Sequence, residues 1–412
     1  MAAHGFLRWA CLSVCILAVV VEPPGAHGTS RAVLSPTLTA QQRVGACAVS
    51  VTPHGYKCQE IEVTTEDGYI LSLQRIPESR AAGEGGQLDK PPVLIQHGVL
   101  VDGTTWLLNP PDENLPFILA DAGFDVWIAN TRGTRFSRKH VSLDPNKPEY
   151  WNWSWDELVM YDLPATIDVV YRQTRDKKIY YVGHSLGSLI ALASLSEGRL
   201  VDKLRSVALL SPVAYLSHMT TALGIVAAKA FVGEMTTLAG MAEFNPKGQA
   251  VANFLKMLCN MPNVDCYDYL SAITGKNCCL NSSTVDIFLQ NEPQSTSVKN
   301  MVHLAQTVRG GILAKYNYGR PDYNLQHYGE EKPPVYNLSN IPHGLPLFMS
   351  YGGKDALSDI QDVAMLLDCL KLHDQDKLTV QFIEDYAHAD FIMGVNAKDL
   401  VYREIIKFFK RG

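Results

Sequence analysis

The stretch IYYVGHSLGSLIALASLSE, residues 179–197, predicts a buried strand that turns sharply into a helix. Four apolar residues lead into the motif Gly-x-Ser-x-Gly, and a run of helix-forming residues follows it. So tight a turn would strain the backbone of Ser185, and glycines at 183 and 187 would avoid clashes with neighbouring backbone. Strand, turn and helix together are the setting of an exposed serine nucleophile. The alternative is an ordinary turn bounded by glycines.

Strands and helices alternate on both sides of this stretch. A hairpin closed by Asp67 and Gly68 is expected at 58–76. Further strands are expected at 93–95, 124–129, 206–210, 345–351 and 378–383, and helices at 115–122, 155–174, 359–372 and 396–410. Ser154 and Glu157 have the spacing of a capping box at the start of the second helix. Because the strands are apolar throughout, the pattern predicts an α/β fold with a mostly parallel sheet covered on both faces.

The alternation stops in the middle of the chain and then resumes. Residues 214–342 contain a cysteine cluster and apolar helical segments but no regular strand–helix repeat. We therefore expect one core domain, residues 29–213 and 343–412, interrupted by an inserted cap at 214–342.

Composition narrows the class of protein. The chain has 412 residues, 47% hydrophobic and 19% charged, with a net charge of -6. A low charge fraction with ample apolar surface argues against disorder. The absence of a basic excess or a heptad pattern argues against nucleic-acid binding and coiled coils.

The first 28 residues have the pattern of a secretory signal peptide. Arg8 precedes a weakly polar-to-apolar run at 9–21, and small residues follow near Ala26 and Gly28. The alternative, a membrane anchor, needs roughly 20 apolar residues. The expected location is extracellular, with the lumen of a vacuole or lysosome as the alternative.

Cysteines and sequons agree with that location. Cys47 and Cys58 could form a disulfide near the mature N-terminus, and the four cysteines within 259–279 favour disulfides over a zinc site because no histidine lies among them. Seven cysteines remain after removal of 1–28, so at least one is a free thiol or bonds another chain. Sequons begin at Asn152, Asn281 and Asn337.

A serine hydroxyl needs a base to take its proton. Of the downstream histidines, His388 lies in the loop after the strand at 378–383, where a base should be. His373, by contrast, lies in a charged segment typical of a solvated helix end. We assign His388 as general base; the alternative is a histidine of a surface loop.

The acid that orients this base should follow the preceding strand. Asp355 is the first carboxylate after the strand at 345–351, beyond a glycine pair. Asp359 is the second candidate, although its position also suits a helix cap. We expect Asp355 to hold His388 in the correct tautomer.

Acyl transfer also needs N–H donors for the oxyanion. The backbone N–H of Leu186, directly after the nucleophile, is one candidate. The second is expected in the loop after 93–95, at Val99, although QHGVL (96–100) could also be a simple turn.

Five blocks in order make the chain resemble the acid lipase family, which includes gastric and lysosomal acid lipases and plant triacylglycerol lipases. The blocks are QHGVL (96–100), LADAGFDVWIANTRG (119–133), GHSLG (183–187), YGGKD (351–355) and YAHADF (386–391). The opening GYKCQEIEVTTEDG (55–68) looks most like the plant members. The resemblance implies an α/β-hydrolase fold with a helical cap, and its triad positions fall on Ser185, Asp355 and His388. Ala387 departs from gastric members, which have Asn there.

The sequence therefore predicts a secreted serine lipase that acts on neutral-lipid esters at a lipid–water interface, with triacylglycerols as the expected substrate. A sterol-ester or small-ester hydrolase and a non-catalytic lipid carrier are the alternatives. No metal or organic cofactor, nucleic acid or membrane span is expected, and the chain is expected to be a monomer.

Overall fold

A computed structural model describes residues 45–81, 89–221, 240–248 and 269–411, together with Gly224 and Thr237. The chain divides into two units, residues 1–43 and 44–412, and every described residue belongs to the second. The expected signal peptide, Cys259 and Cys266 lie outside the described residues.

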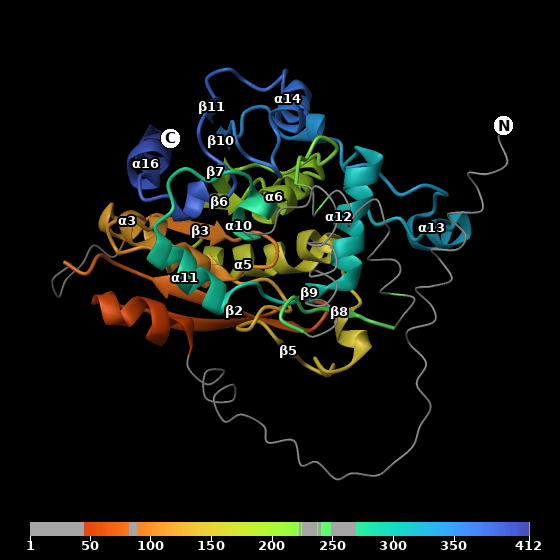
Figure 1. Cartoon of the computed structure of the whole chain (residues 1–412), viewed down its shortest axis with the longest axis horizontal. Helices are drawn as coiled ribbons and strands as arrows, with labels where there is room; N and C mark the ends of the chain where they lie inside the picture. The colour runs from red at the N-terminus through yellow and green to blue at the C-terminus, as the bar shows by residue number, and fades with distance from the viewer. Residues whose placement is uncertain are drawn as a thin grey trace, which may run out of the picture. The chain divides into compact units, whose positions relative to one another are not determined.

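A sheet with nine described strands forms the centre of the second unit (Figure 1). The strands are β1 (Gln59–Thr64), β2 (Tyr69–Ile76), β3 (Pro92–Gln96), β4 (Asp125–Ala129), β5 (Lys139–His140), β6 (Ile179–His184), β7 (Leu204–Leu210), β10 (Leu347–Gly352) and β11 (Leu378–Ile383). Their order is β1-β2-β4-β3-β6-β7-β10-β11, with β5 paired to β2. From β4 to β11 every pairing is parallel. The mostly parallel sheet predicted from the apolar strands is confirmed.

Side chains of the central strands alternate between the two faces of the sheet, and both faces are buried. In β3, Leu94 belongs to one hydrophobic cluster, whereas Val93 and Ile95 belong to the other. Helices cover both faces: α5 (Leu163–Gln173) and α6 (Leu186–Ser196) contribute to the first cluster, and α3 (Leu115–Asp121) and α16 (Arg403–Arg411) to the second. Strands buried on both faces read as continuous apolar runs for this reason.

Two expected helices are interrupted near their start. The helix expected at 155–174 consists of α4 (Trp155–Glu157), a π-helical turn at Leu158–Asp162, and α5. Pro164 has no N–H to continue the regular ladder, which gives a physical reason for the wider turn. Ser154 forms the expected capping box at the start of α4. The C-terminal helix likewise begins with a π-helical turn, Lys398–Tyr402, before α16.

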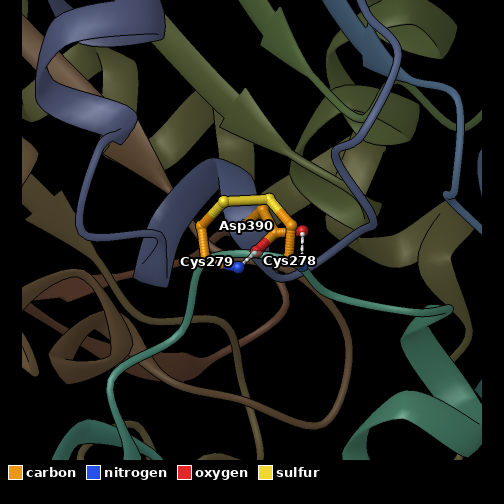
Figure 2. Close-up of side chains that lie close together, drawn as sticks. All are labelled: Cys278, Cys279 and Asp390. Carbon is orange, nitrogen blue, oxygen red and sulfur yellow. Dashed lines mark hydrogen bonds between the residues drawn. A yellow bond between two sulfur atoms is a disulfide. The ribbon is translucent and has the colours of Figure 1, made fainter.

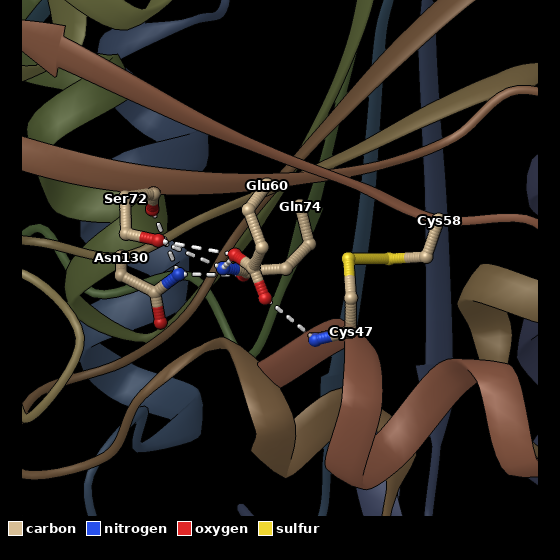
Figure 3. Close-up of a disulfide and its surroundings, with 6 residues drawn as sticks. All are labelled: Cys47, Cys58, Glu60, Ser72, Gln74 and Asn130. Carbon is tan, nitrogen blue, oxygen red and sulfur yellow. Dashed lines mark hydrogen bonds between the residues drawn. A yellow bond between two sulfur atoms is a disulfide. The ribbon is translucent and has the colours of Figure 1, made fainter. Parts of the chain in front are cut away.

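The N-terminal end of the described chain is held by a disulfide and a polar chain of contacts (Figure 3). Cys47 and Cys58 are disulfide-bonded, and the Cys47 N–H donates to Glu60 over 2.7 Å. Gln74 Nε2 donates to the same Glu60 carboxylate over 2.7 Å, and Asn130 Nδ2 donates to Gln74 Oε1 over 2.8 Å. The disulfide is thus tied to the first β-hairpin and through it to the loop after β4.

Helices and one short strand pair make up the described part of the expected cap. They are β8 (Glu243–Phe244), α10 (Tyr269–Thr274), α11 (Ser282–Asn291), β9 (Thr296–Ser297), α12 (Val298–Gly310) and α13 (Pro321–Tyr328). The chain then returns to the sheet, with α14 (Ile360–Cys369) after β10 and α15 (Asp390–Met393) after β11. None of the described helices is long and apolar enough to cross a membrane. The cap boundaries at 214 and 342 stay a prediction.

Candidate active site

Ser185 occupies a strained turn between β6 and α6. Its backbone has φ 54° and ψ -115°, a region that side-chain-bearing residues rarely adopt. A Cβ at Gly183 would lie 2.6 Å from the Gly187 carbonyl oxygen, and one at Gly187 would lie 2.6 Å from the Gln96 carbonyl oxygen. The two glycines therefore let this turn pack against its own helix and against β3, as the motif predicts.

The parallel sheet brings three loops to one edge. Ser185 follows β6, Asp355 follows β10 and His388 follows β11, each beyond the carboxyl end of its strand. In parallel strands these ends lie at the same edge of the sheet. Residues far apart in the sequence thus become neighbours.

His388 and Asp355 are hydrogen-bonded and buried. His388 Nδ1 lies 3.0 Å and 2.9 Å from the two carboxylate oxygens of Asp355. The N–H groups of Leu357 and Ser358 also donate to Asp355 Oδ1, over 2.9 and 2.8 Å. Burial alone would raise the pKa of Asp355, but the charge and hydrogen bond of His388 together with these N–H donors hold the pKa below its usual value. Asp355 is therefore a stable anionic partner for the imidazole.

The other ring nitrogen, His388 Nε2, has no hydrogen-bond partner in the described part of the chain. It therefore makes no hydrogen bond to Ser185 Oγ in this structure. Such bonds are often long in unliganded sites and shorten when substrate binds. A direct contact still joins the two loops: His184, next to Ser185, places Nε2 3.0 Å from the His388 carbonyl oxygen, with the two ring centres 4.7 Å apart. Burial lowers the pKa of His184 to about 3, so this bridge is uncharged.

The loop after β3 packs directly on the nucleophile. A Cβ at Gly98 would lie 3.0 Å from the Ser185 Cβ, so glycine permits the close approach. His97 fixes this loop: its Nε2 accepts from the Thr131 N–H over 3.1 Å, and its Nδ1 is 2.7 Å from the Gly98 carbonyl oxygen. Burial lowers the pKa of His97, which favours the neutral tautomer with Nδ1–H donating.

Val99 and Leu186 border the same small cavity, which has about 10 Å³ of accessible volume. Leu186 is the first residue of α6, so its N–H has no acceptor within the helix. Both residues expected to supply the oxyanion N–H groups therefore border one cavity, and Gly98, which also borders it, is the residue that packs on Ser185.

A segment of the expected cap, residues 274–279, holds the acid and base loops together. The Thr274 carbonyl oxygen accepts from the Ala356 N–H over 3.3 Å and from the His388 N–H over 3.1 Å. Asp390 in turn accepts from the N–H groups of Cys278 and Cys279, both over 3.1 Å (Figure 2). No local sequence signal identifies these contacts, because each joins segments more than 80 residues apart.

The same segment contains a disulfide between the adjacent residues Cys278 and Cys279. Their sulfurs and the Asp390 carboxylate form a group compact enough to be considered as metal ligands. Metal-binding cysteine requires a thiolate, which a disulfide does not offer. The preference for disulfides over zinc is thus supported for these two cysteines. Cys369 is a free thiol among the described cysteines.

Two other sequence interpretations have definite outcomes. Asp359 caps α14, because its side chain accepts from the Gln361 N–H over 2.8 Å, so its alternative role is the one observed. The interpretation of His373 as solvated is wrong: it is 6% exposed, and its Nε2 lies 2.8 Å from the Leu345 carbonyl oxygen. A charged neighbourhood in sequence did not prevent this ring from packing inward.

Comparisons with known proteins agree with this architecture. Residues 91–394 match the family described as the alpha/beta hydrolase fold, and residues 48–110 match the partial alpha/beta-hydrolase lipase region. Triacylglycerol lipase 2 of Arabidopsis thaliana is 63% identical over 89% of this chain and 88% of the relative. Triacylglycerol lipase 1 of the same plant is 42% identical over 88% and 90%, and human gastric triacylglycerol lipase is 37% identical over 86% and 88%.

Solved structures share the fold at low sequence identity. A soluble variant of Saccharomyces cerevisiae monoglyceride lipase has a TM-score of 0.54 at 12% identity, over 86% of this chain and 96% of the other. A structure described as a lipase in an open form has a TM-score of 0.53 at 18% identity, over 86% and 99%. The strand order, the family matches and the relatives together show that this chain belongs to the acid lipase family of α/β hydrolases and is a lipase, a carboxylic ester hydrolase.

Proposed function

We propose that this chain is a secreted serine lipase that hydrolyses triacylglycerols through an acyl-enzyme on Ser185. Ser185 attacks the ester carbonyl while His388 accepts its proton and then passes it to the leaving alcohol. The N–H groups of Val99 and Leu186 stabilise the oxyanion, and water releases the acyl group. Neither a metal nor an organic cofactor takes part.

One observation carries the serine mechanism. His388 has its Nδ1 against the Asp355 carboxylate, whereas its Nε2 has no partner in the described part of the chain. A carboxylate at Nδ1 favours the tautomer whose proton is on Nδ1, which leaves a lone pair on Nε2 for the serine proton. The contact of His388 with His184 supports placing that lone pair beside Ser185.

The substrate assignment is supported by the relatives. Two plant relatives and the gastric relative are all named triacylglycerol lipases. A cap at 214–342 would shield acyl chains from water, and its opening would expose apolar surface to a lipid interface. A sterol-ester or small-ester hydrolase remains the second candidate, and a lipid carrier the third.

The Cys47–Cys58 disulfide supports secretion, because such bonds persist in oxidising compartments. The lumen of a vacuole or lysosome is the alternative location. Asn152, Asn281 and Asn337 are all exposed, as glycan acceptors must be. We expect the mature chain to begin near Ala26 to Gly28 and to lose mass on treatment with an N-glycosidase. An uncleaved N-terminus would contradict secretion by this signal.

A substrate panel tests the function. We expect wild type to hydrolyse emulsified triolein faster than cholesteryl oleate, and S185A to hydrolyse neither, across pH 4–8. Faster hydrolysis of cholesteryl oleate would favour a sterol esterase. Hydrolysis of p-nitrophenyl butyrate alone, with Ser185 labelled by a fluorophosphonate, would contradict a lipase. Lipid binding unchanged in S185A with no wild-type turnover would favour the carrier.

A further inference from the structure

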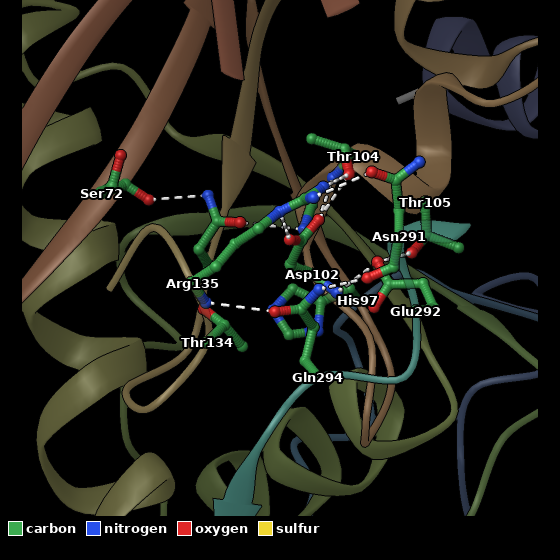
Figure 4. Close-up of polar contacts among 12 residues, drawn as sticks. Ser72, His97, Asp102, Thr104, Thr105, Thr134, Arg135, Asn291, Glu292 and Gln294 are labelled. Atoms are coloured by element: carbon green, nitrogen blue, oxygen red, sulfur yellow. Dashed lines mark hydrogen bonds and ion pairs between the residues drawn. The ribbon is translucent and has the colours of Figure 1, made fainter. Parts of the chain in front are cut away.

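A buried charged cluster joins the loop beside the nucleophile to the expected cap (Figure 4). We call residues 97–102 the oxyanion loop and residues 291–294 the cap strap. Asp102 ends the oxyanion loop and is fully buried, and Glu292 in the cap strap is 1% exposed. Between them lies Arg135, from the loop after β4, with its Nε 2.6 Å from Asp102 Oδ2. Three segments distant in sequence meet at these charges.

Hydrogen bonds attach the cap strap to the oxyanion loop at two points. The Gln294 N–H donates to the Leu100 carbonyl oxygen over 2.7 Å. The Asp102 N–H donates to Glu292 Oε1 over 3.4 Å. Leu100 has φ 61°, a left-handed conformation that a leucine adopts only when its surroundings hold it there. Gln294 thus binds this strained residue itself and Glu292 binds two residues further on, so both contacts lie just after Val99.

Arg135 crosslinks the same three segments. Its Nη2 donates to Thr104 Oγ1 over 2.7 Å, and its Nη1 donates to Asn291 Oδ1 over 3.0 Å. Its backbone N–H donates to Gln294 Oε1 over 3.2 Å. One guanidinium therefore contacts the helical turn after the oxyanion loop, the oxyanion loop itself and the cap strap. The planar guanidinium of arginine carries several N–H donors in a fixed arrangement, so it can make all of these contacts at once. The single ammonium group of a lysine could not.

Glu292 lies near a second buried carboxylate, Asp102, so its own ionisation would add negative charge to the cluster. Asp102 already balances the positive charge of Arg135. Lys247 is the other described cation that acts on Glu292. Its Nζ donates to the Asn291 carbonyl oxygen over 2.8 Å. Glu292 Oε2 is buried with no hydrogen-bond partner among the described residues. Burial and the nearby Asp102 raise the pKa of Glu292 to about 8. The carboxyl is therefore neutral at acid and neutral pH. Burial also lowers the pKa of His97, which faces Asp102 as well.

We propose that Asp102, Arg135 and Glu292 are positioning residues that hold the Val99 N–H in the oxyanion hole by fixing the oxyanion loop to the cap strap. The inference rests on the proposed serine mechanism. Asp102 and Arg135 supply the ion pair, and uncharged Glu292 supplies an acceptor without adding a second buried negative charge. Ionisation of Glu292 would place two carboxylates against one guanidinium and loosen the strap.

The test measures kcat and KM with p-nitrophenyl butyrate, per site titrated by a fluorophosphonate, on the full mature chain. We expect D102N and R135K to lower kcat ~10–100-fold with KM changed less than ~3-fold, because oxyanion donors act in the transition state. We expect wild-type kcat to fall between about pH 7 and 9, as Glu292 ionises. E292Q, a neutral mimic of protonated Glu292, should stay within ~3-fold of wild type at pH 6 and lack this fall. E292A should lower kcat ~10-fold at every pH.

R138Q is the matched control. Arg138 lies on the same loop as Arg135 and pairs with Glu243 of β8 over 2.9 Å. We expect R138Q to keep kcat within ~2-fold, because this partly buried pair does not contact the oxyanion loop.

Two results would overturn the inference: unchanged kcat per titrated site in D102N and R135K despite a lowered Tm, or the same alkaline fall in E292Q as in wild type. If D102N does not fold, R135K and E292Q decide, since both keep the charge balance of the cluster at neutral pH. Failure of the proposed function has a different signature. If wild type is inactive, or if S185A hydrolyses the ester as wild type does, the serine mechanism fails and the inference fails with it. If wild type is active and S185A is inactive, the serine mechanism stands, and the positioning variants decide the inference.

Discussion

Two histidine–aspartate pairs are hydrogen-bonded in the described part of the chain, and they differ in burial and in where the neighbouring serine lies. His388 Nδ1 lies 2.9 Å from Asp355, and His218 Nδ1 lies 2.8 Å from Asp362. The first histidine side chain is 5% exposed and the second 39% exposed. Both pairs would satisfy a search for an oriented imidazole, so the pairing itself does not identify a catalytic base.

The serine beside each pair makes the difference. Ser217 Oγ donates to Asp362 over 2.9 Å and is 3.2 Å from His218 Nδ1, the nitrogen that the aspartate already occupies. This serine competes for the orienting side of the ring. The Nε2 of His388 has no partner in the described part of the chain, and its loop contacts His184, next to the strained Ser185. A base needs its serine on the side of the ring opposite the carboxylate, whereas Ser217 lies on the same side of His218 as Asp362.

Removing each histidine should give the largest contrast. We expect H388Q to lower kcat for p-nitrophenyl butyrate at least ~10⁴-fold, because the serine then has no base. H218Q should stay within ~2-fold. Initial rates per milligram of folded protein check this. Comparable losses in both variants would mean that the Ser217 group takes part in the reaction.

Removing each carboxylate should separate activity from stability. We expect D355N to lower kcat ~10³–10⁴-fold with the fold intact, because an amide favours the wrong tautomer. D362N should keep kcat within ~3-fold but lower the free energy of unfolding by about 1–3 kcal/mol, since Asp362 accepts from the His218 N–H and from Ser217 inside the protein. Rates per titrated site and urea unfolding curves provide the two measurements. A D355N variant that unfolds early but turns over normally would reverse the interpretation.

The smallest expected effect is on thermal stability at acid pH. The pKa of Asp355 lies below its usual value in the folded chain, so its ionised form stabilises the fold above the unfolded pKa of 3.8. That contribution is lost as the pH falls through the lower folded pKa. We expect the Tm difference between wild type and D355N to shrink by about 2–5 °C between pH 5 and pH 2.

S185A is the control for this titration, because it keeps both members of the pair and should follow the wild-type curve. A difference between wild type and D355N that stays constant down to pH 2 would mean that pairing with His388 does not lower the pKa of Asp355.

Much of the fold could be predicted because its signals are local. Apolar strand runs, the capping box at Ser154 and the glycines around Ser185 act within a few residues, and the structure has each of these elements where the sequence places it. Helix continuity was less predictable: a single missing N–H at Pro164 accompanies the π-helical turn before α5.

Sequence reasoning also selects Ser185, Asp355 and His388, because each follows a strand and parallel strands end at one edge. It gives no reason to select Glu292. The carboxyl of Glu292 accepts a hydrogen bond from the Asp102 N–H, which lies 190 residues away in the sequence. The inward packing of His373, the bridge from His184 to His388 and the bonds from Cys278 and Cys279 to Asp390 are equally invisible along the chain.

The sequence by itself thus determined the order of strands and helices, the turn at Ser185 and the loops that follow the strands, since hydrophobic periodicity and backbone sterics are properties of neighbouring residues. Tertiary structure alone decided which buried histidine binds a carboxylate at one ring nitrogen and keeps the other without a partner, which carboxyl is buried beside another, and how the expected cap is fastened to the oxyanion loop. Those outcomes depend on desolvation and on contacts between distant segments, which exist only once the chain has folded.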